Sequence, residues 1–194
     1  MELFSQKNTA IWLGIGSLLF LIAAFNPSSR VFGEAMSDTR IEIINSLRTL
    51  WNISQVLFGL GALITVLALG MMVYELKYIS GSQWAQLAVI LMLVGSLLWC
   101  WHLGERIIYP EGFAHGSNTP YLFMIYSLLS QAGLILIGFF MLKTGIANWV
   151  GWMFVISAVI FFILMVIFKD MPPFVYYVIS GIASVTLYQG ASWS

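Results

Sequence analysis

Six long apolar stretches, separated by short polar or charged segments, dominate the hydrophobic pattern of the chain. Each approaches the roughly 20 residues that a helix needs to cross a hydrocarbon core about 30 Å thick. The stretches are apolar all round and do not alternate with a period of two, which argues against the strands of a β-barrel. We therefore predict an all-α, single-domain bundle of six membrane-spanning helices, at about 9–25, 51–74, 84–103, 120–142, 148–168 and 173–188.

The connection between the first two stretches is long enough to contain structure of its own. Ser37 or Asp38 can cap a helix there. Apolar residues then recur at intervals of three and four, at Ile41, Ile44, Leu47 and Trp51. Two interpretations stay open: an interfacial amphipathic helix over Asp38–Asn52 that runs into the second span, or a soluble helix that lies over the loops.

Composition supports a membrane protein and limits its chemistry. Of the 194 residues, 60% are hydrophobic and 8% are charged, whereas soluble domains carry about 25% charged residues. Eight basic and eight acidic residues cancel, so no nucleic-acid surface is expected. The partners we expect are the lipid bilayer and other membrane subunits. A single cysteine excludes an intramolecular disulfide and a cysteine metal cluster.

An even number of spans puts both ends of the bundle's chain on one side of the membrane. Short turns marked by Lys7, Lys77 and Lys143 lie on that side, while the long loops and most acidic residues lie on the other. A strict count of Lys and Arg favours the long-loop side as cytoplasmic, but the short lysine-marked turns favour the opposite orientation. We expect a protein of the bacterial inner membrane with both termini in the cytoplasm. We also expect the first span to be retained, since no small-residue cleavage site follows it.

Polar side chains inside the predicted spans gather in the half of the bundle nearest the long loops. A polar side chain that faces lipid is costly, so these residues are expected to turn inward. They predict a pocket open to that side, lined by Asn52, Gln55, Tyr126, Ser130, Gln131 and Tyr176. A lipid or a quinone would suit such a pocket, and no other cofactor is predicted.

One concentrated set of ionisable side chains lies at the end of the third stretch. His102, Glu105 and Arg106 are spaced i, i+3, i+4 and project from one helix face. In one interpretation His102 is an acid/base, Glu105 orients it and Arg106 holds an anionic group. In the other, which we favour, the three anchor the helix end at the membrane interface. A metal site would have to combine His102 with His115, and we predict no metal.

Several sequence features resemble a known family. They are the start Gln-Lys-Asn-Thr-Ala (6–10), the long first loop and the segment Leu-Lys-Thr-Gly-Ile-Ala-Asn-Trp-Val-Gly-Trp (142–152). Over most of its length the chain resembles a family of bacterial six-pass membrane proteins that carry a domain of unknown function. The resemblance implies no activity and no site residues.

The sequence as a whole favours a non-catalytic multi-pass membrane protein. We expect either an accessory subunit of a membrane complex or a binder of a small lipophilic ligand in the one-sided pocket. A membrane-embedded enzyme that acts on a lipid-soluble substrate through His102, Glu105 and Arg106 is the alternative. A small transporter is the third hypothesis, and it is weakened because no ionisable residue is predicted near the bilayer centre.

Overall fold

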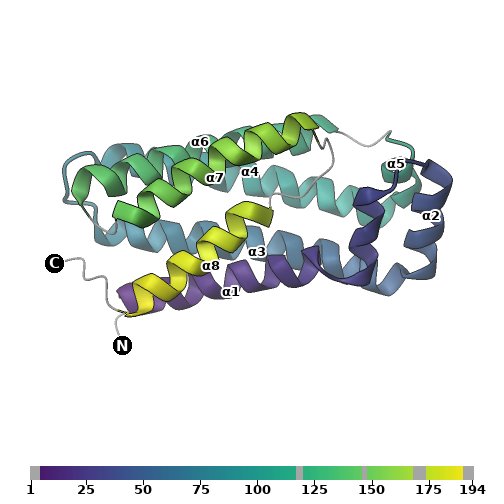
Figure 1. Ribbon diagram of the computed structural model, residues 1–194, viewed down its shortest axis with the longest axis horizontal. Helices are drawn as coiled ribbons and strands as arrows, with labels where there is room; N and C mark the ends of the chain where they lie inside the picture. The colour runs from purple at the N-terminus through teal and green to yellow at the C-terminus, as the bar shows by residue number, and fades with distance from the viewer. Residues whose placement is uncertain (1–4, 117–119, 146–147, 168–173, 190–194) are drawn as a thin grey trace.

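The structure, a computed structural model, describes residues 5–116, 120–145, 148–167 and 174–189 (Figure 1). All regular elements in these ranges are helices, which confirms the predicted all-α class. In chain order they are α1 (Gln6–Ala24), the 3-10 helix η1 (Pro27–Gly33), α2 (Ser37–Ser46), α3 (Arg48–Glu75), α4 (Ser82–Ile108), α5 (Pro110–Ala114), α6 (Pro120–Thr144), α7 (Asn148–Ile167) and α8 (Phe174–Gln189).

Four of these helices are long and apolar enough to cross a membrane: α1, α3, α4 and most of α6. The helices α7 and α8 are also apolar, but shorter over the residues whose side chains are described. All six predicted ranges fall on these helices, and the largest difference is at the end of α4, which continues to Ile108 rather than 103. Residues 168 and 173, at the ends of two predicted ranges, lie outside the described residues.

The apolar helices pack side by side in the order in which they occur in the chain (Figure 1). Contacts join α1 to α3, α3 to α4, α4 to α6, α6 to α7 and α7 to α8, and α8 returns to α1. Connections between successive helices favour antiparallel neighbours when they are short, as between α3 and α4. The Gln6 side-chain amide donates a hydrogen bond of 2.8 Å to the Leu187 carbonyl oxygen. The start of α1 and the end of α8 therefore lie together.

Glycines bring pairs of these helices into backbone contact. A Cβ on Gly61 of α3 would lie 2.8 Å from both the Gly16 carbonyl oxygen and the Phe20 nitrogen of α1. Between α6 and α7, a Cβ on Gly138 would lie 2.7 Å from the Gly151 carbonyl oxygen. Small residues permit such close approach, which is a common source of helix association in membranes.

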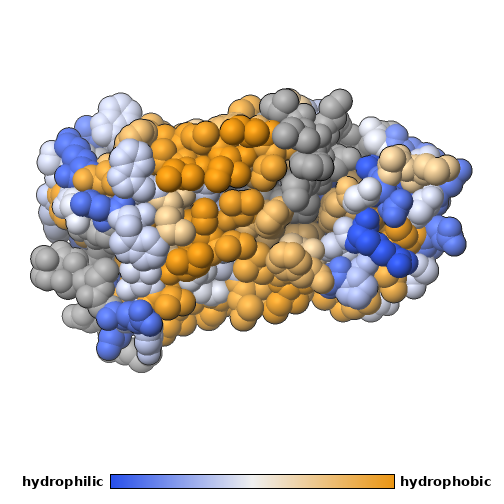
Figure 2. All heavy atoms as spheres, in the orientation of Figure 1, coloured by the Kyte–Doolittle hydropathy of each residue, from blue (hydrophilic) through white to orange (hydrophobic). Residues whose placement is uncertain are grey.

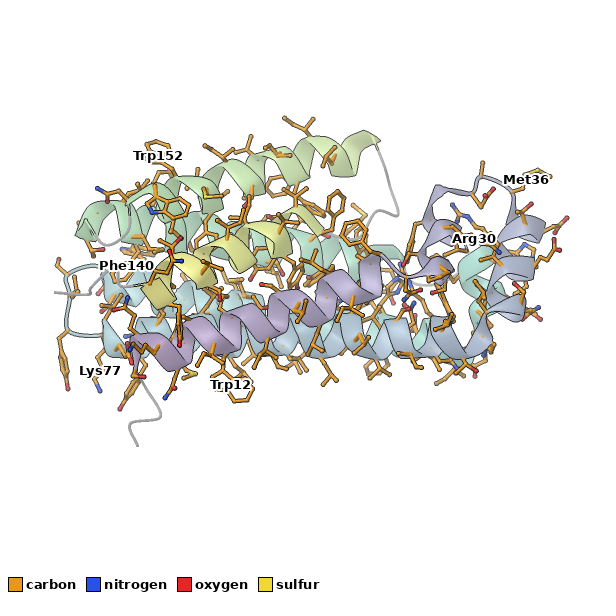
Figure 3. All side chains as sticks on the ribbon, turned by 60° about the horizontal axis from the view of Figure 1, so that its bottom comes forward. Trp12, Arg30, Met36, Lys77, Phe140 and Trp152 are labelled. Carbon is orange, nitrogen blue, oxygen red and sulfur yellow. The ribbon has the colours of Figure 1, made fainter. Side chains whose placement is uncertain are left out.

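The face of the molecule seen in Figure 2 carries a broad apolar region between two polar ends, which we call the apolar belt. Exposed apolar side chains come from all six apolar helices, for example Leu18, Leu67, Ile90, Leu128, Ile163 and Ile182. Trp12 and Trp152 point outward toward the end of the bundle that carries Lys77 (Figure 3), as tryptophans at a membrane–water interface do. Water-soluble monomers rarely expose apolar patches of this extent. The belt fits an integral membrane protein with transmembrane helices.

The helix predicted over Asp38–Asn52 is instead two pieces. The first, α2, ends at Ser46, and α3 begins at Arg48 after a break at Leu47, whose φ and ψ are −120° and 32°. The break is needed because α2 crosses the end of the bundle whereas α3 runs along it (Figure 1). α2 contacts η1, which belongs to the same connection between α1 and α3, and α5, which belongs to the connection between α4 and α6. These contacts hold α2 across the end of the bundle.

Candidate functional site

The ionisable side chains at the end of α4 turn into the protein. His102 and Arg106 are each 2% exposed, and the Arg106 Nε–H donates a hydrogen bond of 3.1 Å to His102 Nε2. Because His102 accepts at Nε2, its ring proton lies on Nδ1, which is 3.9 Å from Glu105 Oε2. Glu105 itself is partly exposed and accepts a hydrogen bond of 3.0 Å from the Trp101 indole. The three candidate residues are thus close together, with Glu105 at the outer edge.

Aromatic rings surround the Arg106 guanidinium. Its Cζ lies 4.4 Å from the ring centre of Phe113, 5.2 Å from that of Trp99 and 5.5 Å from that of Phe32, all within the range of cation–π attraction. The indole of Trp51 also donates a hydrogen bond of 3.2 Å to the Arg106 carbonyl oxygen. Since Phe32 belongs to η1 and Phe113 to α5, Arg106 ties both long connections to α4. It anchors them from inside the protein, and not by extending to the membrane interface.

A row of aromatic side chains leads from this cluster into the bundle. Trp99 of α4 stacks on Tyr126 of α6 with ring centres 4.9 Å apart. The Tyr126 and Tyr177 hydroxyls are hydrogen-bonded at 3.0 Å, and Tyr177 of α8 stacks on Phe20 of α1 at 3.6 Å. All four side chains are buried. The row connects four helices and contributes to the core by aromatic stacking.

The residues of the predicted one-sided pocket divide into two groups. In the first group, Tyr126 of α6 and Tyr176 of α8 both contact Tyr177. Ser130 and Gln131 of the same group are buried on α6. Neither polar atom of the Gln131 side chain has a hydrogen-bond partner within the described chain. On α3, Gln55 is buried and Asn52 half-buried. The pocket that would combine the two groups stays a prediction.

A groove of about 230 Å³ lies between α3 and α4 and opens onto the apolar belt. We call it the α3–α4 groove; its residues include Gln55, Gly59, Leu60 and Leu63 of α3 and Cys100 and Gly104 of α4. Gly104 borders open space there, because a Cβ on it would meet no atom within 4 Å. From Gln55 to Leu63 the groove follows α3 for about 12 Å at 1.5 Å per residue. Its size and apolar walls suit a hydrocarbon chain.

A buried polar side chain borders the α3–α4 groove. Gln55 lines the groove yet is only 1% exposed. Its Nε2 donates a long hydrogen bond of 3.5 Å to the Trp51 carbonyl oxygen, and its Oε1 has no hydrogen-bond partner among the described residues. A buried carbonyl oxygen without a partner costs about 1–3 kcal/mol.

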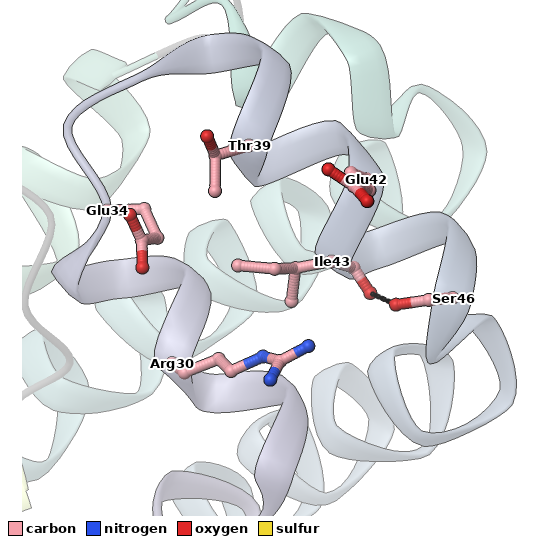
Figure 4. Close-up of a pocket in the computed structure, with 6 residues that line it drawn as sticks. All are labelled: Arg30, Glu34, Thr39, Glu42, Ile43 and Ser46. Carbon is pink, nitrogen blue, oxygen red and sulfur yellow. Dashed lines mark hydrogen bonds between the residues drawn. The ribbon is translucent and has the colours of Figure 1, made fainter.

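A second pocket lies between η1 and α2 at the end of the bundle (Figure 4). It has a volume of about 270 Å³ and is lined by Arg30, Glu34, Thr39, Glu42, Ile43 and Ser46. The only hydrogen bond drawn within it runs from the Ser46 hydroxyl to the Ile43 carbonyl oxygen. Arg30 and Glu42 are exposed to water, which weakens the interaction of their charges with a ligand. We assign no ligand to this pocket.

Metal ligation finds little support in the arrangement of side chains. Within the described ranges, no three His, Cys, Asp or Glu side chains gather closely enough to hold a metal ion. His115 is exposed beyond α5, whereas His102 is engaged with Arg106. The interpretation that combined the two histidines therefore has no observed third ligand among these residues.

Sequence reasoning missed the residues that complete these sites. The sequence indicated Trp51 only as an apolar position of a helix and gave no role to Trp99, yet both are fully buried. Trp99 precedes His102 by three residues on the same helix face, which is the one signal that could have indicated its contact with the ionisable set.

Comparisons with protein families, with curated proteins and with solved structures find no match to the chain.

Proposed function

We propose that this protein is a six-pass integral membrane protein that binds a small lipophilic ligand and has no catalytic activity. The observation that carries the proposal is the α3–α4 groove, because it opens onto the apolar belt and is lined mostly by apolar residues. Ligand pockets are lined predominantly by hydrophobic side chains, and an apolar hollow suits a lipophilic ligand.

The packing of the shorter helices supports six spans. Contacts of α7 with α6 and of α8 with α1 place both helices alongside the four that are long enough to cross a membrane. In this proposal α2 lies at the membrane interface and covers the long connections. Both termini then lie on the side of the Lys77 turn, which we assign to the cytoplasm of a bacterial inner membrane.

The catalytic alternative has weaker support. A general base needs a free lone pair within hydrogen-bond reach of the substrate. His102 Nε2 already accepts the Arg106 Nε–H, both side chains are buried, and Arg106 lies against the ring of Phe113. Anchoring of the two long connections accounts for the positions of His102 and Arg106 without a substrate.

Identification of bound molecules tests the proposed function. The full chain is purified in a mild detergent and analysed by native mass spectrometry and by extraction of its lipids. We expect one lipophilic molecule for each chain, and we expect Gly104→Leu, which fills the groove, to lose it. Val94→Leu is the matched control, because Val94 is exposed on the outer face of the same helix and should not affect retention.

Three other results would have clear meanings. Wild-type protein without a retained molecule would contradict the proposal, as would equal retention by Gly104→Leu. Stoichiometric protein subunits in place of a ligand would favour an accessory role in a membrane complex.

A further inference from the structure

The end of the bundle that carries Lys77 has an excess of positive charge. Among the described residues it holds three lysines, Lys7, Lys77 and Lys143, and one carboxylate, that of Glu75. The described residues at the opposite end carry four arginines and five carboxylates, which nearly balance. We infer that the turn between α3 and α4 (residues 76–81) binds the head group of an anionic phospholipid through Lys77 and Lys143. This turn lies outside the α3–α4 groove, so the inference does not depend on the ligand proposed for the groove.

Hydrogen bonds within the turn fix the backbone that carries Lys77. The Ser82 hydroxyl donates a hydrogen bond of 2.7 Å to the Lys77 carbonyl oxygen, and the Ile79 N–H donates one of 3.0 Å to the Leu76 carbonyl oxygen. Gly81 closes the turn with a φ of 93°, which lies in the left-handed region that favours glycine. Lys77 is therefore held close to the start of α4.

Lys143 reaches the same turn from the end of α6. A Cβ on Gly81 would lie 3.7 Å from the Lys143 Nζ, and the Lys143 side chain is exposed. Since Ser82, the next residue after Gly81, is bonded to the Lys77 backbone, the two lysines border one short turn. Each ammonium group has three N–H donors on a flexible stem. Two such cations attract an anion at the turn more strongly than either does alone.

Aromatic side chains place the Lys77 ammonium at the boundary of the membrane. Its Nζ lies 3.8 Å from the ring centre of Tyr74 and 5.0 Å from that of Tyr78, both within the range of cation–π attraction. Tyr78 is 90% exposed, and Trp12 and Trp152 point outward toward the same end (Figure 3). Because tyrosine and tryptophan prefer the membrane–water interface, we place this cation at the level of the lipid head groups.

The position of the two lysines beside the apolar belt favours a lipid over a soluble anion. The polar end that carries Lys77 adjoins the belt (Figures 2 and 3), so a bound phospholipid can lay its acyl chains along the belt while its phosphate meets the lysines. Each Lys or Arg near a membrane surface raises the affinity for anionic lipid about fivefold. Phosphatidylcholine has no net charge and gains little from this attraction. We therefore expect a head group of the phosphatidylglycerol type, which has a phosphate and no amine.

Lipid titration followed by native mass spectrometry tests the inference. The full chain in a mild detergent is titrated with phosphatidylglycerol or with phosphatidylcholine of the same acyl chains. We expect the first phosphatidylglycerol to bind about 25-fold more tightly than phosphatidylcholine, because two contributions of about fivefold multiply. Lys77→Gln and Lys143→Gln should each lower this preference about fivefold, and the double variant should remove it.

Two control variants separate this turn from the general charge of the protein. Lys77→Arg keeps the cation beside Tyr74 and should retain the preference. Arg30→Gln removes an exposed cation from the opposite end of the bundle and should leave the preference unchanged.

Two further measurements identify the source of the anion. Glycerophosphoglycerol, which is the same head group without acyl chains, should not displace the bound lipid at equal concentration. Retention of phosphatidylglycerol on the immobilised protein should fall when sodium chloride is raised from about 0.15 M to about 1 M, because the Debye length shortens from about 8 Å to about 3 Å.

The opposite results would overturn the inference. Equal affinity for the two lipids in the wild type, or an undiminished preference in the double variant, would refute the site. A loss in Arg30→Gln as large as that in Lys77→Gln would mean a general charge effect and would refute its location at the turn. Displacement by glycerophosphoglycerol would show a site for soluble anions and would refute the lipid. None of these results bears on the α3–α4 groove, which Gly104→Leu tests separately.

Discussion

The contact between α1 and α3 allows a test of the packing with a matched pair of substitutions in one helix. Gly61→Ala would place a methyl group 2.8 Å from the Gly16 carbonyl oxygen and the Phe20 nitrogen and 2.9 Å from the Phe20 Cβ. Ordinary van der Waals contact begins at 3.4 Å, so the backbones would have to separate locally by about 0.6 Å, the difference between the two distances. Gly70→Ala, on the same helix, would place its methyl at 3.4 Å from Val89 Cγ1 and require no such movement.

The comparison isolates the cost of this movement. Both substitutions gain the same preference of alanine over glycine in a helix, about 0.8–1 kcal/mol, so this contribution cancels between them. Separation of packed surfaces by 0.5–1 Å forfeits about a quarter to a half of each dispersion contact, and overpacking a core typically costs about 1–3 kcal/mol. We therefore expect Gly61→Ala to be less stable than Gly70→Ala by about 1–3 kcal/mol.

Unfolding by sodium dodecyl sulfate in mixed micelles measures this difference. Far-UV circular dichroism follows the helices, and fluorescence of the buried Trp51 and Trp99 follows the tertiary structure. Coincident transitions by both probes would justify a two-state analysis. Equal stability of the two variants, or greater damage from Gly70→Ala, would refute the close crossing of α1 and α3.

Two further predictions concern the polar cluster and the aromatic row. Arg106→Met keeps most of the buried volume but removes the cation between Phe32 and Phe113. The rate of amide hydrogen exchange in η1 and α5 should then rise about tenfold or more. Unchanged exchange rates would contradict the anchoring role of Arg106. Tyr126→Phe leaves the buried Tyr177 hydroxyl without its partner on α6 and should cost about 1–3 kcal/mol in the same unfolding assay. In the Tyr126→Phe variant, the further substitution Tyr177→Phe should cost less stability than the same substitution costs in the wild type. Strictly additive losses of stability would show that the two hydroxyls are not coupled.

The apolar pattern was sufficient to predict the membrane helices because their length and composition are properties of contiguous residues. The six predicted ranges coincide with helices, and α1, α3, α4 and most of α6 meet the requirement for crossing a membrane. The pattern did not predict the break at Leu47. That break follows from the change of direction between α2 and α3, which depends on the contacts of α2 with η1 and α5.

The site was less accessible to sequence reasoning, because its shape depends on residues that are distant in the chain. Charged side chains at a helix end usually extend to the interface, but Arg106 is covered by Phe32 and Phe113 from two separate connections. The α3–α4 groove likewise is lined by residues of two helices, among them Gly59 and Gly104, that are distant in the chain. Gln55 was predicted as a pocket residue from its polarity alone, and its position beside a groove shared with α4 could not be inferred from that.

The ring of helices has a consequence for biosynthesis. The apolar helices from α1 to α7 lie in space in the order of the chain, so each newly inserted helix can pack against the one before it. One side of α1 stays without a neighbour until α8 is inserted. Until α8 arrives, Phe20 lacks the Tyr177 ring and the Ala10 carbonyl oxygen lacks the Ser184 hydroxyl. Of the helices described, α1 thus acquires its second neighbour only after α8, which is synthesised later than the other five apolar helices, has entered the bilayer.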